Sequence, residues 1–331
     1  MKREEYLRDL KLKLEQDDFA QVEEAIAYFN DLLEDRMAEE GMNEEAAVAL
    51  MDAPDLVASQ LRGGPEKAAE GPQDEPQGPS WRSTVAQADQ VRRILLRDRN
   101  MRLTVIGEKR EDILIRHPES EKVRYAFTLS EGRLSLTREE LPLTWQLFFW
   151  DGLPREMREV TLRVPLDLAA EMDLRTSNAR LTLRDITCWG SLTAATSNGA
   201  LSLENISAKS LSIKTSNAAL SLSQASARQD LKAATSNGKI TARGLSAPGL
   251  TLKTSNASIA VAELESGDIT LGTSNAAVKG TLSGQVADWT ITSRTSNGKN
   301  TLPASNQGGS RRLSAHTSNA NISLKFTGDA H

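Results

Sequence analysis

If this chain catalyses a reaction on a polysaccharide, the catalytic groups would be carboxylates, because glycoside hydrolysis needs two acids held close together. The acids in the repeats between Met172 and Leu324 are Asp173, Asp185, Glu204, Asp230, Glu263, Glu265, Asp268 and Asp288. They stand at different positions in successive copies of a repeat of about 20 residues, so the repeat does not gather them on one face. We therefore predict that the protein is not an enzyme and needs no cofactor.

Histidine and cysteine offer no better site. The histidines are His117, His316 and His331, and Cys188 is the single cysteine. His117 precedes Pro118 in a predicted turn, so we expect its ring on the solvated surface. Cys188 has no histidine near it in the repeat, which favours a partly buried small side chain over a nucleophile. The sequence also has no phosphate-binding glycine motif and no Cys or His pair at metal-ligand spacing.

The repeat itself is the strongest signal. Thr-Ser-Asn occurs eight times, with gaps of 19 to 22 residues between successive asparagines, and Ala or Gly always follows. The asparagines are Asn178, Asn198, Asn217, Asn237, Asn256, Asn275, Asn297 and Asn319. Aliphatic residues stand three and five positions after most of them, with the main exceptions at Asn300 and Gly280. Self-similarity at a fixed period predicts a mainly β fold, a parallel β-helix or solenoid with about 20 residues per coil.

Each repeat reads as a strand, a tight turn at Asn-Ala or Asn-Gly, a second strand and a second turn. Asn and Gly suit such turns because both tolerate a positive φ. Alternation places Thr176 and its equivalents on the apolar face, and we expect the asparagines to stack inside as a structural ladder of amides. Eight coils at the usual strand spacing give an axis of roughly 38 Å. The sequence does not fix the handedness, and a right-handed coil is our working assumption.

Two interpretations of Thr-Ser-Asn compete. A row of identical side chains could bind carbohydrate or ice, but an ice-binding row needs threonines that point outward from a flat face. Because alternation turns Thr176 inward, we favour the structural interpretation.

Composition divides the chain into three parts. Residues 1–62 show apolar residues at helical spacing among many acids, and they predict a small all-α domain. Residues 63–84 are rich in Pro and Gly and predict a linker. Residues 85–327 alternate with a period of two and predict the solenoid, with initial coils at 85–170 and the eight Thr-Ser-Asn repeats at 171–327.

One apolar cluster lies outside the repeats. Its members are Trp145, Leu147, Phe148, Phe149 and Trp150. A solenoid has to cover its open ends, because an exposed core and unpaired strand edges invite aggregation. We expect this cluster to cap the solenoid, with docking of a partner or contact with a membrane as the alternative.

The charge of the chain argues against a nucleic-acid partner. The net charge of −5 and the pI near 5.5 give no general attraction for nucleic acid. Residues 1–62 carry 17 acids and 7 bases, a net charge of −10 that leaves +5 for the rest. A charged N-terminus and the lack of a long apolar run predict neither a signal peptide nor a transmembrane segment. We therefore expect a cytoplasmic protein, with peripheral membrane attachment as the alternative.

Residues 1–62 resemble the bacterial HAAS signalling domain. The likeness rests on Tyr6-Leu7, Leu10, Ala27-Tyr28-Phe29, Asp31, Glu40-Gly41, Glu44-Glu45-Ala46 and the ending Pro54-x-Leu56-Val57-Ala58. The family usually has Leu-Gly-x-Pro where this chain has Leu50-Met51-Asp52-Ala53-Pro54. The resemblance implies a domain that docks a protein partner, often beside a PadR-like transcription regulator.

Residues from about 90 to 327 are similar to a β-strand repeat family often labelled "putative adhesin". Val160-Thr-Leu-Arg-Val-Pro165, followed by Leu174-Arg-Thr-Ser-Asn178, matches the way that family leads into its repeats. The resemblance implies a fold and a role in the cell envelope or in stress sensing, but no activity. Relatives commonly carry transmembrane helices between the two parts, where this chain has its Pro-rich linker.

These observations together predict a non-enzymatic signalling or scaffold protein. Its helical domain docks a protein partner, such as a PadR-like regulator or an envelope-stress component, and its solenoid offers a rigid interaction surface. Homo-oligomers through the sides or edges of the solenoid are a further expectation. The alternatives are a carbohydrate-binding or carbohydrate-active β-helix protein and a surface adhesin.

Overall fold

The computed structural model describes residues 2–16, 43–49, 53–62, 78–120, 123–139 and 153–328, together with scattered positions between 19 and 51. The chain divides into two compact units. The helical unit comprises Met1–Ser80, Glu119–Arg124 and Glu139–Pro154. The solenoid unit comprises Trp81–Pro118, Tyr125–Arg138 and Arg155–His331.

The helical unit has an apolar core of its own. Its described helices are α1 (Arg3–Gln16), α3 (Glu44–Ala49) and α4 (Pro54–Arg62). A spacing of four residues places Tyr6, Leu10 and Leu14 of α1 on one buried face. The other described residues buried in this core are Ala25, Phe29, Leu33, Ala47, Val48, Val57 and Ala58. Pro54 opens α4, where its missing N–H costs no helical hydrogen bond.

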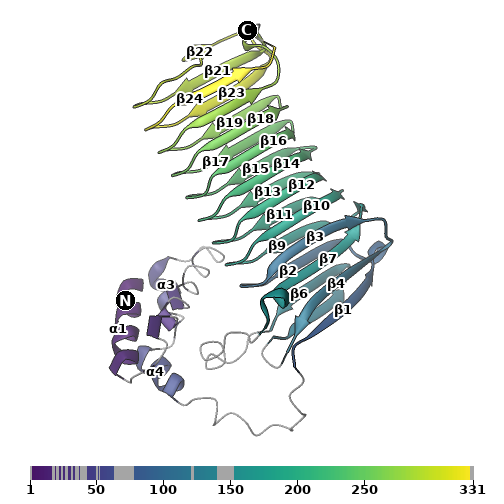
Figure 1. The fold of residues 1–331 in the computed structure, drawn as a ribbon, viewed down its shortest axis with the longest axis vertical. Helices are drawn as coiled ribbons and strands as arrows, with labels where there is room; N and C mark the ends of the chain where they lie inside the picture. Colours follow the sequence, from purple (N-terminus) through teal and green to yellow (C-terminus); the bar gives the residue numbers. More distant parts are fainter. Residues whose placement is uncertain are drawn as a thin grey trace. The chain divides into compact units, whose positions relative to one another are not determined.

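The solenoid unit consists of two twelve-stranded sheets (Figure 1). Sheet A contains, in order, β1 (Ser80–Gln87), β4 (Asp112–Glu119), β7 (Glu159–Pro165), β3 (Arg102–Glu108), β10 (Leu181–Cys188), β12 (Leu201–Ala208), β14 (Leu220–Ala227), β16 (Ile240–Ser246), β18 (Ile259–Leu264), β20 (Val278–Leu282) and β24 (Ile322–Phe326), with β8 (Asp167–Leu168) paired to β10. Sheet B contains β22 (Ser305–Asn306), β21 (Trp289–Arg294), β23 (Arg311–His316), β19 (Asp268–Gly272), β17 (Gly249–Lys253), β15 (Asp230–Ala234), β13 (Ser210–Lys214), β11 (Ser191–Ala195), β9 (Glu171–Arg175), β2 (Arg93–Arg97), β6 (Arg133–Arg138) and β5 (Tyr125–Ser130). Short 3-10 helices are η2 (Ala88–Gln90), η3 (Arg155–Met157) and η4 (Val286–Asp288).

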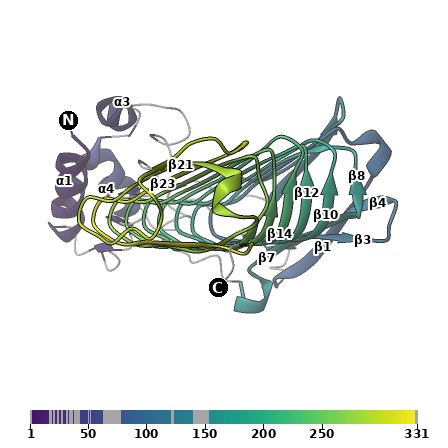
Figure 2. The ribbon, with the colours of Figure 1, turned by 90° about the horizontal axis from the view of Figure 1, so that it is seen from above.

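Most repeats contribute one strand to each sheet, and the strands of successive coils are parallel and in register. In sheet A, for example, Leu181 pairs with Leu201, which pairs with Leu220. These aliphatic residues are 0–1% exposed. Figure 2 shows the stacked coils from above, overlying one another. A mainly β solenoid preceded by a small helical part, as the sequence predicts, is confirmed.

The first two coils are stacked in the reverse of their chain order. Strands β2 and β3 form the first coil and pair with β9 and β10. The next coil, β6 and β7, pairs with the other side of β2 and β3 and therefore lies outside them. Strands β5 and β4 then add in antiparallel fashion to β6 and β7. This change of direction ends the parallel stack.

The last two coils are reversed in the same way. Strands β23 and β24, although last in the chain, pair with β19 and β20, and β21 from the preceding coil pairs with the outer side of β23. Trp289 of β21 is fully buried, 6.1 Å from the ring of Phe326 and 4.4 Å from the guanidinium of Arg311. Asn300, an exception in the repeat, belongs to this outermost coil, and its Nδ2 donates to Ser293 Oγ at 2.8 Å.

Each long repeat strand of sheet A contains one residue with a positive φ. Asp185, Asn205, Gln224 and Glu263 have φ between 50° and 57°, and Gly244 has φ 62° at the equivalent place. The expected positive φ at the Asn-Ala or Asn-Gly turn is therefore wrong, since it lies seven residues later. The turn is held instead by the coil beneath it. For example, the backbone N–H groups of Ser197 and Asn198 both donate to the carbonyl oxygen of Ser177 in the coil beneath.

The start of the solenoid also differs from the predicted boundary. Strand β1 begins at Ser80, whereas the sequence predicted a linker as far as residue 84. Residues 63–77 of that linker lie outside the described residues. None of the helices that the structure describes is long and apolar enough to cross a membrane.

Candidate functional site

The threonines of Thr-Ser-Asn point into the solenoid, as alternation predicts. The buried ones are 0–7% exposed: Thr176, Thr196, Thr215, Thr235, Thr254, Thr273 and Thr317. In a central coil, Oγ1 of Thr215 donates to the carbonyl oxygens of Ser197 and Gly199, both at 3.2 Å. This direction removes the threonines from any outward row that could bind ice.

The asparagines form a continuous row of amide–amide hydrogen bonds. In each bond Nδ2 of one asparagine donates to Oδ1 of the asparagine that precedes it in the row, at 2.6–2.9 Å. The spatial order is Asn100, Asn178, Asn198, Asn217, Asn237, Asn256, Asn275, Asn319 and Asn297. All nine side chains are exposed, so the expected position inside the coil is wrong. Thr-Ser-Asn is a corner rather than a strand, and the inward–outward alternation therefore stops at the threonine.

Asn100 is a member of the ladder that the sequence analysis missed. In its coil, Asp98 takes the buried place of the threonine and accepts hydrogen bonds from the backbone N–H groups of Asn100 and Met101, both at 2.7 Å. The second carboxylate oxygen of Asp98 accepts from the Tyr125 hydroxyl at 2.6 Å. Leu103, three positions after Asn100, carries the aliphatic signature of the repeat and could have revealed this coil.

Most of the candidate catalytic acids are engaged with neighbouring side chains. The ion pairs, at 2.9–3.4 Å, are Asp173–Arg175, Glu204–Arg184, Asp230–Lys232, Glu263–Arg243 and Asp268–Arg312. Asp185 accepts from Nδ2 of Asn205 at 2.8 Å, and Asp288 accepts from the backbone N–H of Gln285 at 2.8 Å. Among the described residues, no three His, Cys, Asp or Glu side chains stand close enough to hold a metal ion.

His117 is not on the surface, contrary to the sequence prediction. It is 2% exposed in β4, its Nδ1 lies 3.1 Å from the Pro118 carbonyl oxygen, and its ring lies 4.8 Å from that of Tyr125. The alternation of Ile113 and Ile115 continues to His117, and this pattern could have indicated an inward side chain. His316 is exposed, and His331 lies outside the described residues.

Cys188 is a buried member of a column of small residues that continues through Ala208 and Ala227. Burial raises the pKa of its thiol to about 11. A thiol that stays protonated at neutral pH is a poor nucleophile. Trp189, its neighbour, is 58% exposed and lies 5.1 Å from the guanidinium of Arg228.

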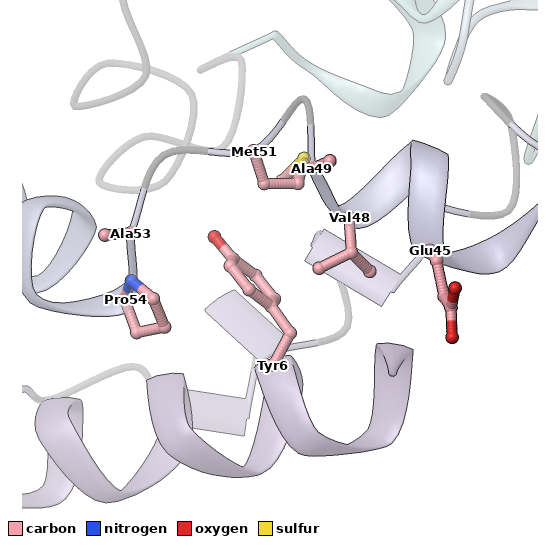
Figure 3. Close-up of a pocket in the computed structure, with 7 residues that line it drawn as sticks. All are labelled: Tyr6, Glu45, Val48, Ala49, Met51, Ala53 and Pro54. Atoms are coloured by element: carbon pink, nitrogen blue, oxygen red, sulfur yellow. The ribbon is translucent and has the colours of Figure 1, made fainter. Parts of the chain in front are cut away.

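The helical unit contains a shallow, mostly apolar pocket of about 230 Å³ (Figure 3). Its lining residues are Tyr6, Glu45, Val48, Ala49, Met51, Ala53 and Pro54. Figure 3 shows the Tyr6 ring rising between Val48 and Pro54. The apolar cluster Trp145, Leu147, Phe148, Phe149 and Trp150 lies outside the described residues. Its role as a cap or docking patch therefore stays a prediction.

The fold and the ladder define a β-solenoid repeat protein. The family "Toastrack DUF4097" matches residues 91–325, and the chain belongs to this family. A solved "putative cell adhesion protein" from Clostridium sporogenes ATCC 15579 is similar, at 11% identity and a TM-score of 0.22, over 75% of this chain and 100% of that chain. A "putative adhesin" from Bacteroides fragilis NCTC 9343 is similar at 8% identity and a TM-score of 0.35, over 74% and 97%. No curated protein matches.

The family match confirms the predicted resemblance of the repeat part to an adhesin-like β-strand repeat family. The two solved structures are too distant to support any statement about function. The HAAS-like character of residues 1–62 stays a prediction.

Proposed function

We propose that the protein is a non-enzymatic, two-part interaction protein of the envelope or stress response. Its helical unit binds a protein partner, and its solenoid serves as a rigid surface. The observation that carries the non-enzymatic part is the pairing of solenoid acids with the cations and amides beside them. Such pairing occupies the carboxylate oxygens that a general acid or base would have to present to a substrate.

The pocket of the helical unit supports the docking role. It is lined by apolar side chains of α3, the following turn and the start of α4, with the Glu45 carboxylate among them. An apolar side chain of a partner would fill it, and a nearby cation would complement the acidic surroundings. The resemblance of residues 1–62 to HAAS domains favours a PadR-like transcription regulator as that partner.

Titration calorimetry of the full-length chain with the PadR-like regulator of the same genome tests the proposal. Ala49 is exposed at the pocket, so Ala49→Arg fills the space without disturbing the core, and we expect binding at least tenfold weaker. Ser59→Arg adds the same charge to an exposed position of α4 outside the pocket lining and should leave the affinity unchanged. No binding by the unaltered chain, or equal losses in both variants, would count against the docking role. The cytoplasmic location stays a prediction that cell fractionation would check.

A further inference from the structure

The corners that carry the asparagine ladder make up one straight side of the solenoid, which we call the Thr-Ser-Asn edge. It comprises residues 97–102, 175–180, 195–200, 214–219, 234–239, 253–258, 272–277, 316–321 and 294–299, in spatial order. In-register coils repeat about every 4.8 Å, so these nine corners form a rigid row roughly 38 Å long.

The charged residues of this edge are almost all cations. Its only acid is Asp98, which is 7% exposed and faces inward. Its exposed cations are Arg102, Arg180, Lys214, Lys239, Lys253, Arg294 and Lys299. Lys214, Lys253 and Arg294 lie where strands of sheet B end. The other four lie at or just before the start of the sheet A side, so both flanks of the edge are basic.

Several cations elsewhere on the solenoid are paired with acids. Arg184, Lys232, Arg243 and Arg312 each have an acid within 3.4 Å on their own strand or on a neighbouring strand. Within the described residues, none of the seven exposed cations of the edge has an ion-pair partner. A protein with a net charge of −5 thus keeps one long, straight, unpaired basic row.

The shape and chemistry of the edge select among polyanions. Single-stranded nucleic acid needs aromatic side chains for base stacking, and the nine corners contain no Phe, Tyr or Trp. A single polymer chain that follows one flank would leave the cations of the other flank unused. A layer of anionic lipid headgroups contacts both flanks at once, and the corner residues between them are small: Ser, Asn, Ala and Gly.

We propose that the Thr-Ser-Asn edge is a docking surface for an anionic lipid membrane. The edge offers no large exposed apolar side chain for insertion, so the attachment is electrostatic. Each cation close to such a surface strengthens binding about fivefold, and several together give stable but salt-sensitive attachment. This inference goes beyond the proposed function, because it does not depend on the partner of the helical unit.

Sedimentation of the full-length protein with vesicles tests the inference. We expect binding to vesicles of phosphatidylcholine mixed with phosphatidylglycerol, none to phosphatidylcholine alone, and release when salt is raised. The combined variant Lys214→Gln, Lys239→Gln and Lys253→Gln removes cations from both flanks and should weaken partitioning about 100-fold.

The matched control is Lys109→Gln, Lys209→Gln and Lys325→Gln. These lysines are also exposed, change the net charge by the same amount and lie away from the edge. The control should partition like the unaltered protein, and unchanged circular dichroism should show that both variants are folded. Equal loss in the two variants, or equal binding to neutral vesicles, would overturn the inference. Stronger retention by a uronate polysaccharide than by the anionic vesicles would also overturn it, because the ligand would then be a polymer.

Discussion

The threonine and the asparagine of each repeat make different contacts at the same corner. The threonine lies inside and satisfies backbone carbonyls, whereas the asparagine lies outside and joins its neighbours. Because the asparagine amides are exposed, water competes for their hydrogen bonds, and each bond contributes only a modest net free energy. The aliphatic columns behind the corner therefore supply most of the stability.

Asn217→Ala and Leu220→Ala separate these contributions. Asn217→Ala removes the amide bonds to Asn198 and Asn237, both at 2.7 Å, and should lower the free energy of unfolding by about 1 kcal/mol. Leu220→Ala leaves a cavity in the core, where the side chain is 1% exposed, and should lower it by about 2–5 kcal/mol. Urea unfolding followed by circular dichroism measures both. A loss for Asn217→Ala as large as that for Leu220→Ala would show that the ladder, not the core, holds the coils together.

Cys188 makes the stability depend on alkaline pH. Burial raises the pKa of its thiol to about 11, above the value near 8.5 of an unfolded chain. The contribution of the neutral thiol is therefore complete below about pH 8.5 and is lost as the pH rises towards 11. Cys188→Ala should reduce this alkaline loss. A thiol reagent at neutral pH should label Cys188 only after unfolding, and rapid labelling of the native protein would contradict the assignment.

The inward or outward direction of a side chain can be predicted from the sequence where a strand continues, but not where it ends. Alternation correctly turns Thr215 inward, because the threonine is still in phase with the strand before it. Two residues later the corner breaks the phase, so the exposed side of Asn217 could not be read from parity. His117 shows the reverse error: a following proline suggested a turn, although the strand continues through it.

At the scale of the strand, the positive-φ residue in each long strand of sheet A costs conformational free energy. Most of its positive-φ positions hold residues other than glycine, a conformation that costs about 1–2 kcal/mol for an ordinary side chain. Gln224→Gly should therefore raise the free energy of unfolding by up to about 1 kcal/mol, after the greater entropy of glycine in the unfolded chain is subtracted.

Ser223→Gly is the control for this prediction. Ser223 precedes Gln224 in β14 without a positive φ, so glycine there brings only the entropy cost and should lower the stability by about 0.5–1 kcal/mol. Thermal unfolding of both variants measures the difference. The same sign of change in both would mean that the positive φ at Gln224 carries no strain.

The order of strands could be predicted from the sequence only in the middle of the solenoid. Between Leu181 and Val278 the repeat length is nearly constant, so consecutive coils are neighbours. At the N-terminal end the second coil of the chain lies outside the first, and at the C-terminal end the second-to-last coil lies outside the last. The two longer gaps of 22 residues, on either side of Asn297, are compatible with either order, because pairing energy depends on strand faces and not on sequence distance.

At the scale of the whole chain, composition divides the protein as the structure does. The acidic helical part and the basic Thr-Ser-Asn edge belong to different units, and each unit has its own apolar core. A helical unit of this size buries little surface and is marginally stable, whereas a stack of coils gains stability with each interface between repeats. Two cores of such different size should unfold in separate steps.

Leu10→Ala tests this independence. Leu10 is 0% exposed in the helical core, and its truncation should cost about 2–5 kcal/mol, which is a large part of the stability of a small unit. We expect the helical transition in a calorimetric scan to move to lower temperature or disappear, because the core loses a central side chain. The later transition of the solenoid should keep its midpoint, since the strands pack around Leu220 and its equivalents and not around Leu10. Leu220→Ala should have the opposite effect, shifting only the later transition. If either substitution moved both transitions together, the two units would share one cooperative core.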